Sequence, residues 1–146
     1  MSKSHLFTPF TLRGITLKNR LVVSPMCMYS ANDGFFNEWH HVHLSSRAVG
    51  GYSLIFTEAA AVCPEGRITP RCAGLWKDSH IDPLRRSVQF IKSQGAIAGV
   101  QLAHAGRKGS SSPPWEGSKH LKDNEEGWDT VAPSPIAFNT GNMWKV

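Results

Sequence analysis

Three short apolar runs, separated by two more polar segments, dominate the hydrophobic pattern of this chain. The runs cover residues 20–23, 52–59 and 96–102. The first is rich in β-branched residues and stops before Pro25, as a short buried strand does. The second is almost continuously apolar, which is typical of a strand in a parallel sheet covered by helices. We therefore predict three strands at these places.

The first intervening segment has the features of a helix over about residues 38–49. Asn37 is a suitable N-cap, because its side chain can accept a backbone N–H of the first turn. The pair Gly50-Gly51 supplies the stop.

The second helix is expected to end near Gln94 and to begin at Ser79 or Asp82. Asp82 would cap the helix and place Pro83 at the first helical position. The apolar residues that recur at the i, i+4, i+7 spacing of one buried face are Leu84, Val88 and Ile91.

The order strand, helix, strand, helix, strand predicts an α/β fold with a parallel sheet and right-handed crossovers. Before it, alternating apolar residues in 8–12 and 15–17 flank Arg13-Gly14, which predicts a small β-hairpin. After the third strand, residues 103–146 are rich in proline and lack periodicity. We expect them to form a long capping loop, since loops of more than about 15 residues are usually functional.

Composition excludes several classes of protein. The net charge is +5, but the 16 Lys and Arg residues are scattered rather than gathered in a stripe, which argues against nucleic-acid binding. Three cysteines without repeated spacing argue against a disulfide framework and favour a reducing, cytoplasmic setting. No apolar run reaches about 18 residues, so no transmembrane helix is expected. Residues 1–5 lack the apolar core of a secretory signal.

The candidate chemistry lies at the carboxyl ends of the predicted strands, where parallel α/β folds bind ligands. The first strand is followed by Ser24-Pro25-Met26-Cys27, the second ends at Ala59, and the third contains Gln101. An amide both donates and accepts, and a small residue allows a flat ring to approach the backbone. Together these residues suit a planar, polar cofactor.

Taken singly, the same residues also suit structural roles. Pro25 and Met26 could end a strand and fill a gap in the core, and Cys27 could be an inert buried thiol. Gln101 alone is weak evidence for a cofactor site. Their coincidence at three successive strand ends favours the functional interpretation.

Metal and phosphate sites are disfavoured. His40, His41 and His43 lie near Glu38, but only the first and third share a helical face and no His-Glu-x-x-His motif is present. Capping and packing explain these histidines better than metal binding, so no metal ligand is predicted. No glycine-rich phosphate loop follows a strand, and no Gly-x-Ser-x-Gly elbow is found.

Six motifs, in register from about residue 6 to 138, resemble the Old Yellow Enzyme family, and especially its bacterial-type, cysteine-containing ene-reductases. The motifs are Leu6-Phe7-Thr8-Pro9-Phe10, Leu17-Lys18-Asn19-Arg20, Ser24-Pro25-Met26-Cys27-Met28-Tyr29, Pro64-Glu65-Gly66-Arg67-Ile68-Thr69, Gln101-Leu102-Ala103-His104-Ala105-Gly106-Arg107-Lys108 and Ala132-Pro133-Ser134-Pro135-Ile136-Ala137-Phe138.

The resemblance implies an FMN-binding (β/α)8 TIM barrel whose floor is covered by a hairpin. It implies that Cys27 tunes the flavin reduction potential and that Tyr29 contacts substrate. The residues implied to contact FMN are Ser24, Pro25, Met26, Cys27, Ala59 and Gln101.

The resemblance also implies a ping-pong reaction. NADPH or NADH delivers a hydride to the flavin, and an alkene activated by a carbonyl or nitro group then takes that hydride at its β-carbon. Hydrogen bonds to the carbonyl or nitro oxygen stabilise its developing negative charge. The implied partner is thus a small activated alkene, with no nucleic acid or membrane, and the complete enzyme is implied to be a homo-oligomer.

The family's substrate-binding His/His or His/Asn pair, its flavin-contacting arginine and its phosphate loop follow later strands, which the 146 residues do not include. His104 belongs to the third-strand motif and is not taken for the missing donor. A full barrel needs about 250 residues. We therefore expect residues 1–146 to form a partial barrel domain without the C-terminal strands.

Two alternatives stay open. The chain could be a catalytically inactive remnant or an interaction module, which flavin content would distinguish. It could also belong to another FMN barrel, such as a dihydroorotate-type dehydrogenase, which a comparison of enone and dihydroorotate as substrates would separate.

Overall fold

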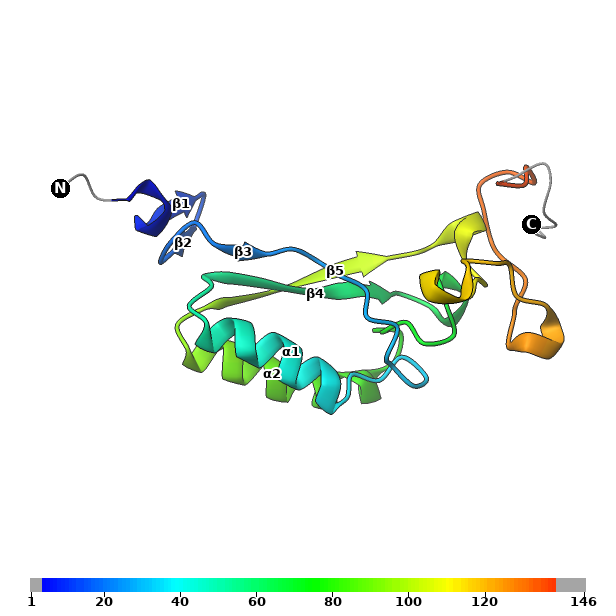
Figure 1. Cartoon of the computed structure of the whole chain (residues 1–146), viewed down its shortest axis with the longest axis horizontal. Coiled ribbons are helices and arrows are strands. Elements are labelled where there is room, and N and C mark those ends of the chain that lie inside the picture. Colours follow the sequence, from blue (N-terminus) through cyan, green and yellow to red (C-terminus); the bar gives the residue numbers. More distant parts are fainter. Residues whose placement is uncertain (1–3, 139–146) are drawn as a thin grey trace.

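A three-stranded parallel sheet forms the centre of the computed structural model, which describes residues 4–138 (Figure 1). The strands are β3 (Val22–Val23), β4 (Leu54–Ala61) and β5 (Ile97–Ala103), in the order β3-β4-β5. The last two match their predicted runs to within two residues. The first is shorter than predicted, because the Arg20 N–H donates to Leu6 O (2.9 Å) rather than to a neighbouring strand.

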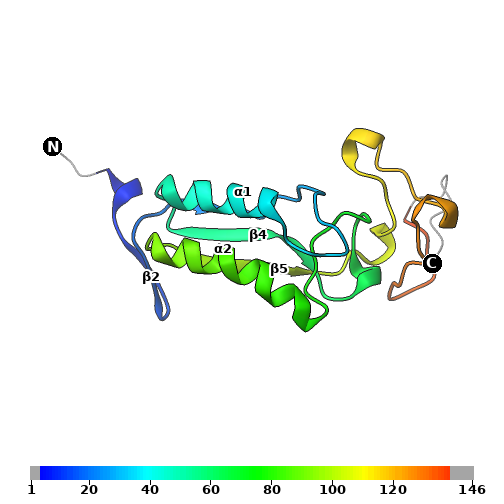
Figure 2. The same cartoon turned by 90° about the horizontal axis from the view of Figure 1, so that it is seen from below.

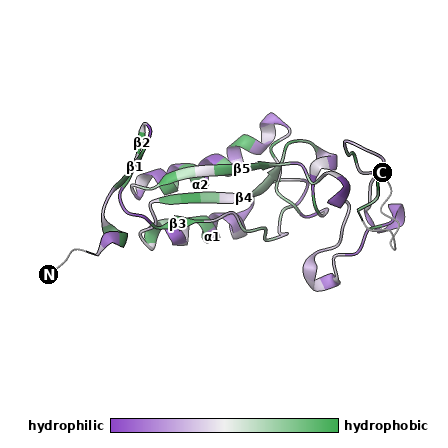
Figure 3. Ribbon diagram, turned by 90° about the horizontal axis from the view of Figure 1, so that it is seen from above, coloured by the Kyte–Doolittle hydropathy of each residue, from purple (hydrophilic) through white to green (hydrophobic). Residues whose placement is uncertain are grey.

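Two helices, α1 (Glu38–Val49) and α2 (Ile81–Ser93), cover one face of this sheet (Figures 1 and 2). The βαβαβ order is therefore confirmed. The buried residues that form the core between helices and sheet are Val23, Leu44, Ala48, Ile55, Ile91 and Ala96. Seen from the other side, the strands are largely hydrophobic, and no helix of the described chain covers them (Figure 3).

Helix α1 has the predicted bounds. The Asn37 side chain accepts the Trp39 N–H (3.1 Å), and Gly50 follows as the C-cap. Both ends are encoded locally, since an N-cap side chain and a glycine stop act within one helical turn.

The predicted start of α2 is wrong in detail. A 3-10 turn, η3 (Asp78–His80), runs directly into the helix, and His80 occupies the cap position without a side-chain cap bond. Asp82 and Pro83 therefore lie inside the first turn rather than at its entrance. The buried face is centred on Ser87 and Ile91.

The predicted hairpin is confirmed. Strands β1 (Phe10–Leu12) and β2 (Ile15–Leu17) pair antiparallel around a turn at residues 13–14. The hairpin lies beyond the end of the sheet at which the strands begin (Figure 1). The Lys18 side chain ties it to the other elements by donating to Gln94 O (2.8 Å).

Residues 104–138, which we call the capping segment, follow β5 at the opposite end of the sheet (Figure 1). The predicted loop extends to residue 146, but 139–146 lie outside the described residues. The segment is anchored to the loop after β4, since the Ala105 N–H donates to Gly66 O (2.8 Å) and the Ser111 N–H to Ile68 O (2.9 Å). Its 3-10 turns are η4 (Gly106–Lys108), η5 (Pro114–Glu116) and η6 (Asp123–Glu125).

Neither of the two α-helices in residues 4–138 has the length and apolar character needed to cross a bilayer.

Candidate functional site

The uncovered face of the sheet carries two of the predicted site residues side by side. Because Ile55 packs against the helices, the alternating side chain of Phe56 points to the uncovered face, together with its Cα partner Gly99. Two residues further along β5, Gln101 shares the face of Gly99 and is the Cα partner of Ala59. The strand ends thus place a small side chain beside an amide, as the sequence predicted.

A β-bulge in β4 separates these two pairs. Between Phe56 and Ala59 the register shifts, so β4 has one more residue than β5 over this stretch. In a regular strand with one uncovered face, only one of two consecutive side chains is buried. Thr57 and Glu58 are consecutive and both are buried, as a bulge allows. The bulge returns Ala59 to the uncovered face and turns Glu58 toward α1.

The Cys27 thiol lies against this bulge and is half-buried. The Ala59 backbone N–H lies near its sulfur. Burial raises the pKa of the Cys27 thiol above its ordinary value, the Ala59 N–H opposes that rise, and nearby Cys72 and Glu58 add to it. At neutral pH this group is therefore a thiol rather than a thiolate. The structure brings Cys27 and Ala59 together.

Tyr29 has a backbone conformation that is unusual for its type. Its φ is +51°, in the left-handed region that residues other than glycine seldom adopt. The ring meets Trp115 of the capping segment edge-on, with centroids 5.6 Å apart. Burial, and then the neighbouring Cys27, raise the pKa of the Tyr29 phenol above its ordinary value. The phenol therefore keeps its proton at neutral pH.

The remaining predicted residues are open to a ligand. Ser24 and Met26 are exposed and Pro25 is half-buried, all three directly following β3. Gln101 is also exposed, and its amide makes no hydrogen bond within residues 4–138. No side-chain hydrogen bond in the described chain joins Ser24, Pro25 or Met26 to Gln101.

A buried polar network beneath the site was not predicted. The side chains of His40 on α1 and Glu58 on β4 are both fully buried, with Nε2 and Oε1 3.1 Å apart. The other carboxylate oxygen of Glu58 accepts the Met28 N–H (3.4 Å). His40 Nδ1 accepts the Asn37 N–H (3.1 Å), and Asn37 Nδ2 donates to Ser30 O (2.6 Å). The sequence signal is Glu58 itself, a single acid in the otherwise almost continuously apolar run 52–59.

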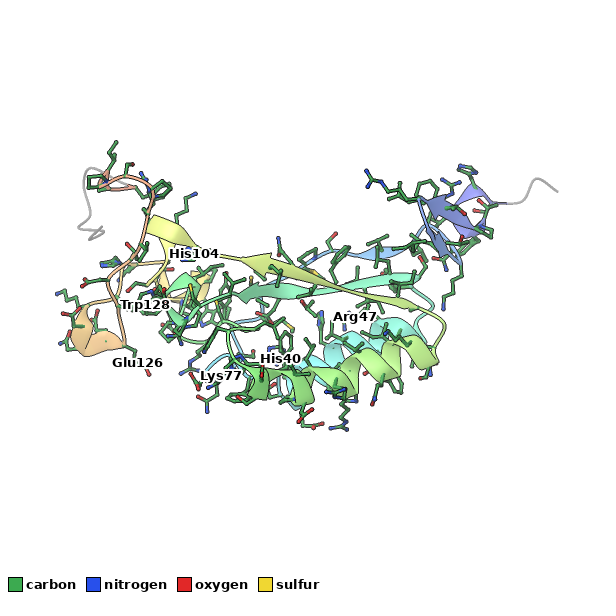
Figure 4. The ribbon with its side chains drawn as sticks, turned by 180° about the vertical axis from the view of Figure 1, so that it is seen from behind. His40, Arg47, Lys77, His104, Glu126 and Trp128 are labelled. Atoms are coloured by element: carbon green, nitrogen blue, oxygen red, sulfur yellow. The ribbon has the colours of Figure 1, made fainter. Side chains whose placement is uncertain are left out.

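Two further histidines, His41 and His104, have structural partners. His41 Nδ1 lies 3.1 Å from Ser87 Oγ, and His104 Nδ1 accepts the Gly106 N–H (3.0 Å). In Figure 4, His104 lies at the end of β5 and His40 at the start of α1. Within residues 4–138, no three His, Cys, Asp or Glu side chains gather as a metal site.

An arginine and a tryptophan join the capping segment to the loop after β4. Trp128 Nε1 donates to Glu65 O (3.0 Å), and the Arg67 guanidinium lies 4.9 Å from the centroid of the Trp128 ring. Figure 4 shows Trp128 where the capping segment meets that loop. These contacts hold the segment beside the strand ends, so it can form a wall of the site.

Comparison with known proteins gives consistent results. The NADPH dehydrogenase of Geobacillus sp. (strain WCH70) is 46% identical over 136 residues, which are 92% of this chain and 36% of the relative. The NADPH dehydrogenase of Bacillus subtilis (strain 168) is also 46% identical over 136 residues, with the same coverage. The chain therefore spans about a third of the length of the curated relatives it matches.

Solved structures show the same fold. The Old Yellow Enzyme from Pichia sp. AKU4542 superposes with a TM-score of 0.76 at 25% identity, over 94% of this chain and 33% of that one. Morphinone reductase in complex with tetrahydroNAD superposes with a TM-score of 0.71 at 24% identity, over 94% of this chain and 42% of that one. The predicted α/β fold, part of a TIM barrel, is confirmed.

The family assignment follows from the match along the chain. Residues 5–137 match the profile of the NADH:flavin oxidoreductase / NADH oxidase family. FMN and a reduced nicotinamide are the cofactors of that family. The sequence motifs, the bare sheet face and these matches agree, and the chain belongs to the NADH:flavin oxidoreductase / NADH oxidase family, with Old Yellow Enzyme among its structural relatives.

Proposed function

We propose that the chain forms part of the FMN site of an NAD(P)H-dependent oxidoreductase that reduces activated C=C bonds. The observation that carries the proposal is the pairing of Ala59 with Gln101 on the uncovered face, with the Cys27 thiol against Ala59. Bound FMN would supply hydride transfer between NAD(P)H and a substrate alkene.

The residues fit a flat heterocycle with polar edges. The Gln101 amide is exposed and unpaired within residues 4–138, so both its donor and its acceptor are available to a ring edge. Ala59 has only a methyl side chain, so a planar ring can approach its backbone. Ser24, Pro25 and Met26 lie at the neighbouring strand end and would contact the same ring.

Cys27 and Tyr29 would act on the bound groups in different ways. A neutral thiol beside the ring changes the polarity of its surroundings and hence the flavin reduction potential. The Tyr29 phenol is protonated at neutral pH, and burial raises its pKa further. Its O–H can therefore donate to a substrate carbonyl or nitro oxygen and stabilise negative charge that develops there.

Flavin titration of the purified chain tests the site. We expect saturable quenching of FMN fluorescence, weakened by about 5- to 150-fold in Gln101→Ala, because loss of a buried polar partner costs about 1–3 kcal/mol. Gln89→Ala, an exposed position on α2, is the matched control and should bind as the wild type does. Absent binding, or equal binding by both variants, would contradict the site.

The reaction is tested on a complete, flavin-loaded barrel that contains residues 1–146, because the substrate-binding pair and the phosphate loop that the family resemblance implies follow later strands. We expect NADPH-dependent reduction of cyclohexenone and no turnover of dihydroorotate. Cys27→Ala should shift the flavin midpoint potential while FMN binding is retained. Turnover of dihydroorotate alone would favour the other class of FMN barrel, and failure of residues 1–146 to bind flavin in the titration would favour an inactive remnant or an interaction module.

A further inference from the structure

The buried His40–Glu58 pair lies between α1 and β4, on the side of the sheet that the helices cover. Both side chains are fully buried between α1 and β4, and Nε2 and Oε1 lie 3.1 Å apart without a well-aligned hydrogen bond. Burying an imidazole and a carboxylate together is costly unless their polar atoms are partnered. A buried ion pair often adds little to the stability of the fold. The other hydrogen-bond partners of His40 and Glu58 therefore point to a further role.

Those partners belong to the loop that carries the candidate site residues. Glu58 Oε2 accepts the Met28 N–H (3.4 Å), and Met28 lies between Cys27 and Tyr29. The backbone N–H of the adjacent residue of β4, Ala59, lies near the Cys27 sulfur. The bulge in β4 therefore holds the loop at two successive positions.

The same network also holds the loop at Ser30, after Tyr29. His40 Nδ1 accepts the Asn37 N–H (3.1 Å), and Asn37 Nδ2 donates to Ser30 O (2.6 Å). Ser30 Oγ in turn donates to Met28 O (2.9 Å). The backbone is thus hydrogen-bonded at Met28 before Tyr29 and at Ser30 after it, which helps a tyrosine with a φ of +51° to keep that conformation.

We propose that His40 and Glu58 are positioning residues: through the Met28 N–H and the Asn37–Ser30 link they fix the loop that presents Cys27 and Tyr29 to the flavin and substrate. This role rests on the proposed function. The positioning itself is a property of the chain, so it can be measured without flavin.

Two readouts report the loop directly. Hydrogen exchange at the Met28 amide reports its bond to Glu58, and the rate of Cys27 alkylation against pH, followed by peptide mass spectrometry, reports the environment of the thiol. The groups that act on that thiol are the Ala59 N–H, Cys72 and Glu58, with the Tyr29 phenol nearby.

For Glu58→Ala we expect faster exchange at Met28, while the amides of β5 stay protected. Cys27 should also alkylate faster at neutral pH, because removing the Glu58 carboxylate lowers the pKa of the thiol and raises its thiolate fraction. Glu58→Gln keeps an oxygen acceptor and should restore protection at Met28. Asp78→Ala, which removes an exposed carboxylate from η3, is the control and should change neither readout.

Ser30→Ala keeps the test informative if a variant in the buried pair does not fold. It removes only the Ser30 Oγ–Met28 O bond in a half-buried loop, and we expect a smaller change in the same direction at both readouts. Unchanged Met28 exchange and Cys27 alkylation in folded Glu58→Ala, or in Ser30→Ala where Glu58→Ala is unfolded, would overturn the proposal. A changed loop without any FMN binding would instead reject the proposed function and leave the positioning role intact.

Discussion

Asn37 connects the start of α1 to the loop that carries Cys27 and Tyr29. Replacing it separates two contributions to stability, the helix cap and the hydrogen bond to Ser30. Its Oδ1 accepts the Trp39 N–H (3.1 Å), and its Nδ2 donates to Ser30 O (2.6 Å). Loss of an N-cap costs about 1 kcal/mol. Loss of one exposed side-chain hydrogen bond costs about 0.5–1 kcal/mol. Asn37→Ala should therefore lower the free energy of unfolding by about 1.5–2 kcal/mol.

Asn37→Asp is the matched variant. It keeps the cap acceptor and gains about 0.3–1 kcal/mol from a negative charge at the helix N-terminus. It also loses the donor to Ser30 O. The two effects nearly cancel, so we expect its unfolding free energy to lie within about 0.5 kcal/mol of the wild type.

Urea unfolding followed by far-UV circular dichroism measures both variants at one pH. A thermal melt provides a second measure, since about 3 °C of midpoint shift corresponds to 1 kcal/mol in a chain of this size. A loss below about 0.5 kcal/mol in Asn37→Ala would show that water replaces the cap without cost. Equal losses in Asn37→Ala and Asn37→Asp would show that the link to Ser30, and not the cap, carries the effect.

Two further predictions concern packing and pH. Gly99→Ala should lower the free energy of unfolding by about 1–3 kcal/mol, because overpacking displaces neighbours and its Cβ would lie 2.6 Å from the Phe56 ring. Gly14→Ala, with nothing within 4 Å, should be nearly neutral in the same urea assay, and equal losses would contradict the packing argument. Burial raises the pKa of the Cys72 thiol, so the folded chain holds that proton more tightly than the unfolded chain. The resulting contribution to stability is present below about pH 8.5, the pKa of the thiol in the unfolded chain, and is lost as pH rises through the pKa of the thiol in the folded chain. Unfolding free energies measured from pH 7 to 10 should fall more steeply in the wild type than in Cys72→Ala, and parallel curves would refute this assignment.

The sequence alone determined the elements whose signals are local. Helix α1 begins after Asn37 and ends before Gly50 as predicted, because capping acts within one turn. The strands followed from apolar runs, and the family followed from motifs spread along the chain. The start of α2 was misjudged because η3 continues directly into the helix, so that Asp82 lies inside the first turn.

The tertiary structure decided how the site is held. Nothing local marks the bulge that turns Glu58 toward α1, since it exists only in the register of β4 against β5. His40 and Glu58 lie 3.1 Å apart although the rest of α1 and a loop separate them in sequence. Trp115 likewise meets Tyr29 only because the capping segment lies beside the strand ends. Periodicity and caps report interactions between near neighbours, whereas a buried polar pair depends on which distant elements the packed core brings together.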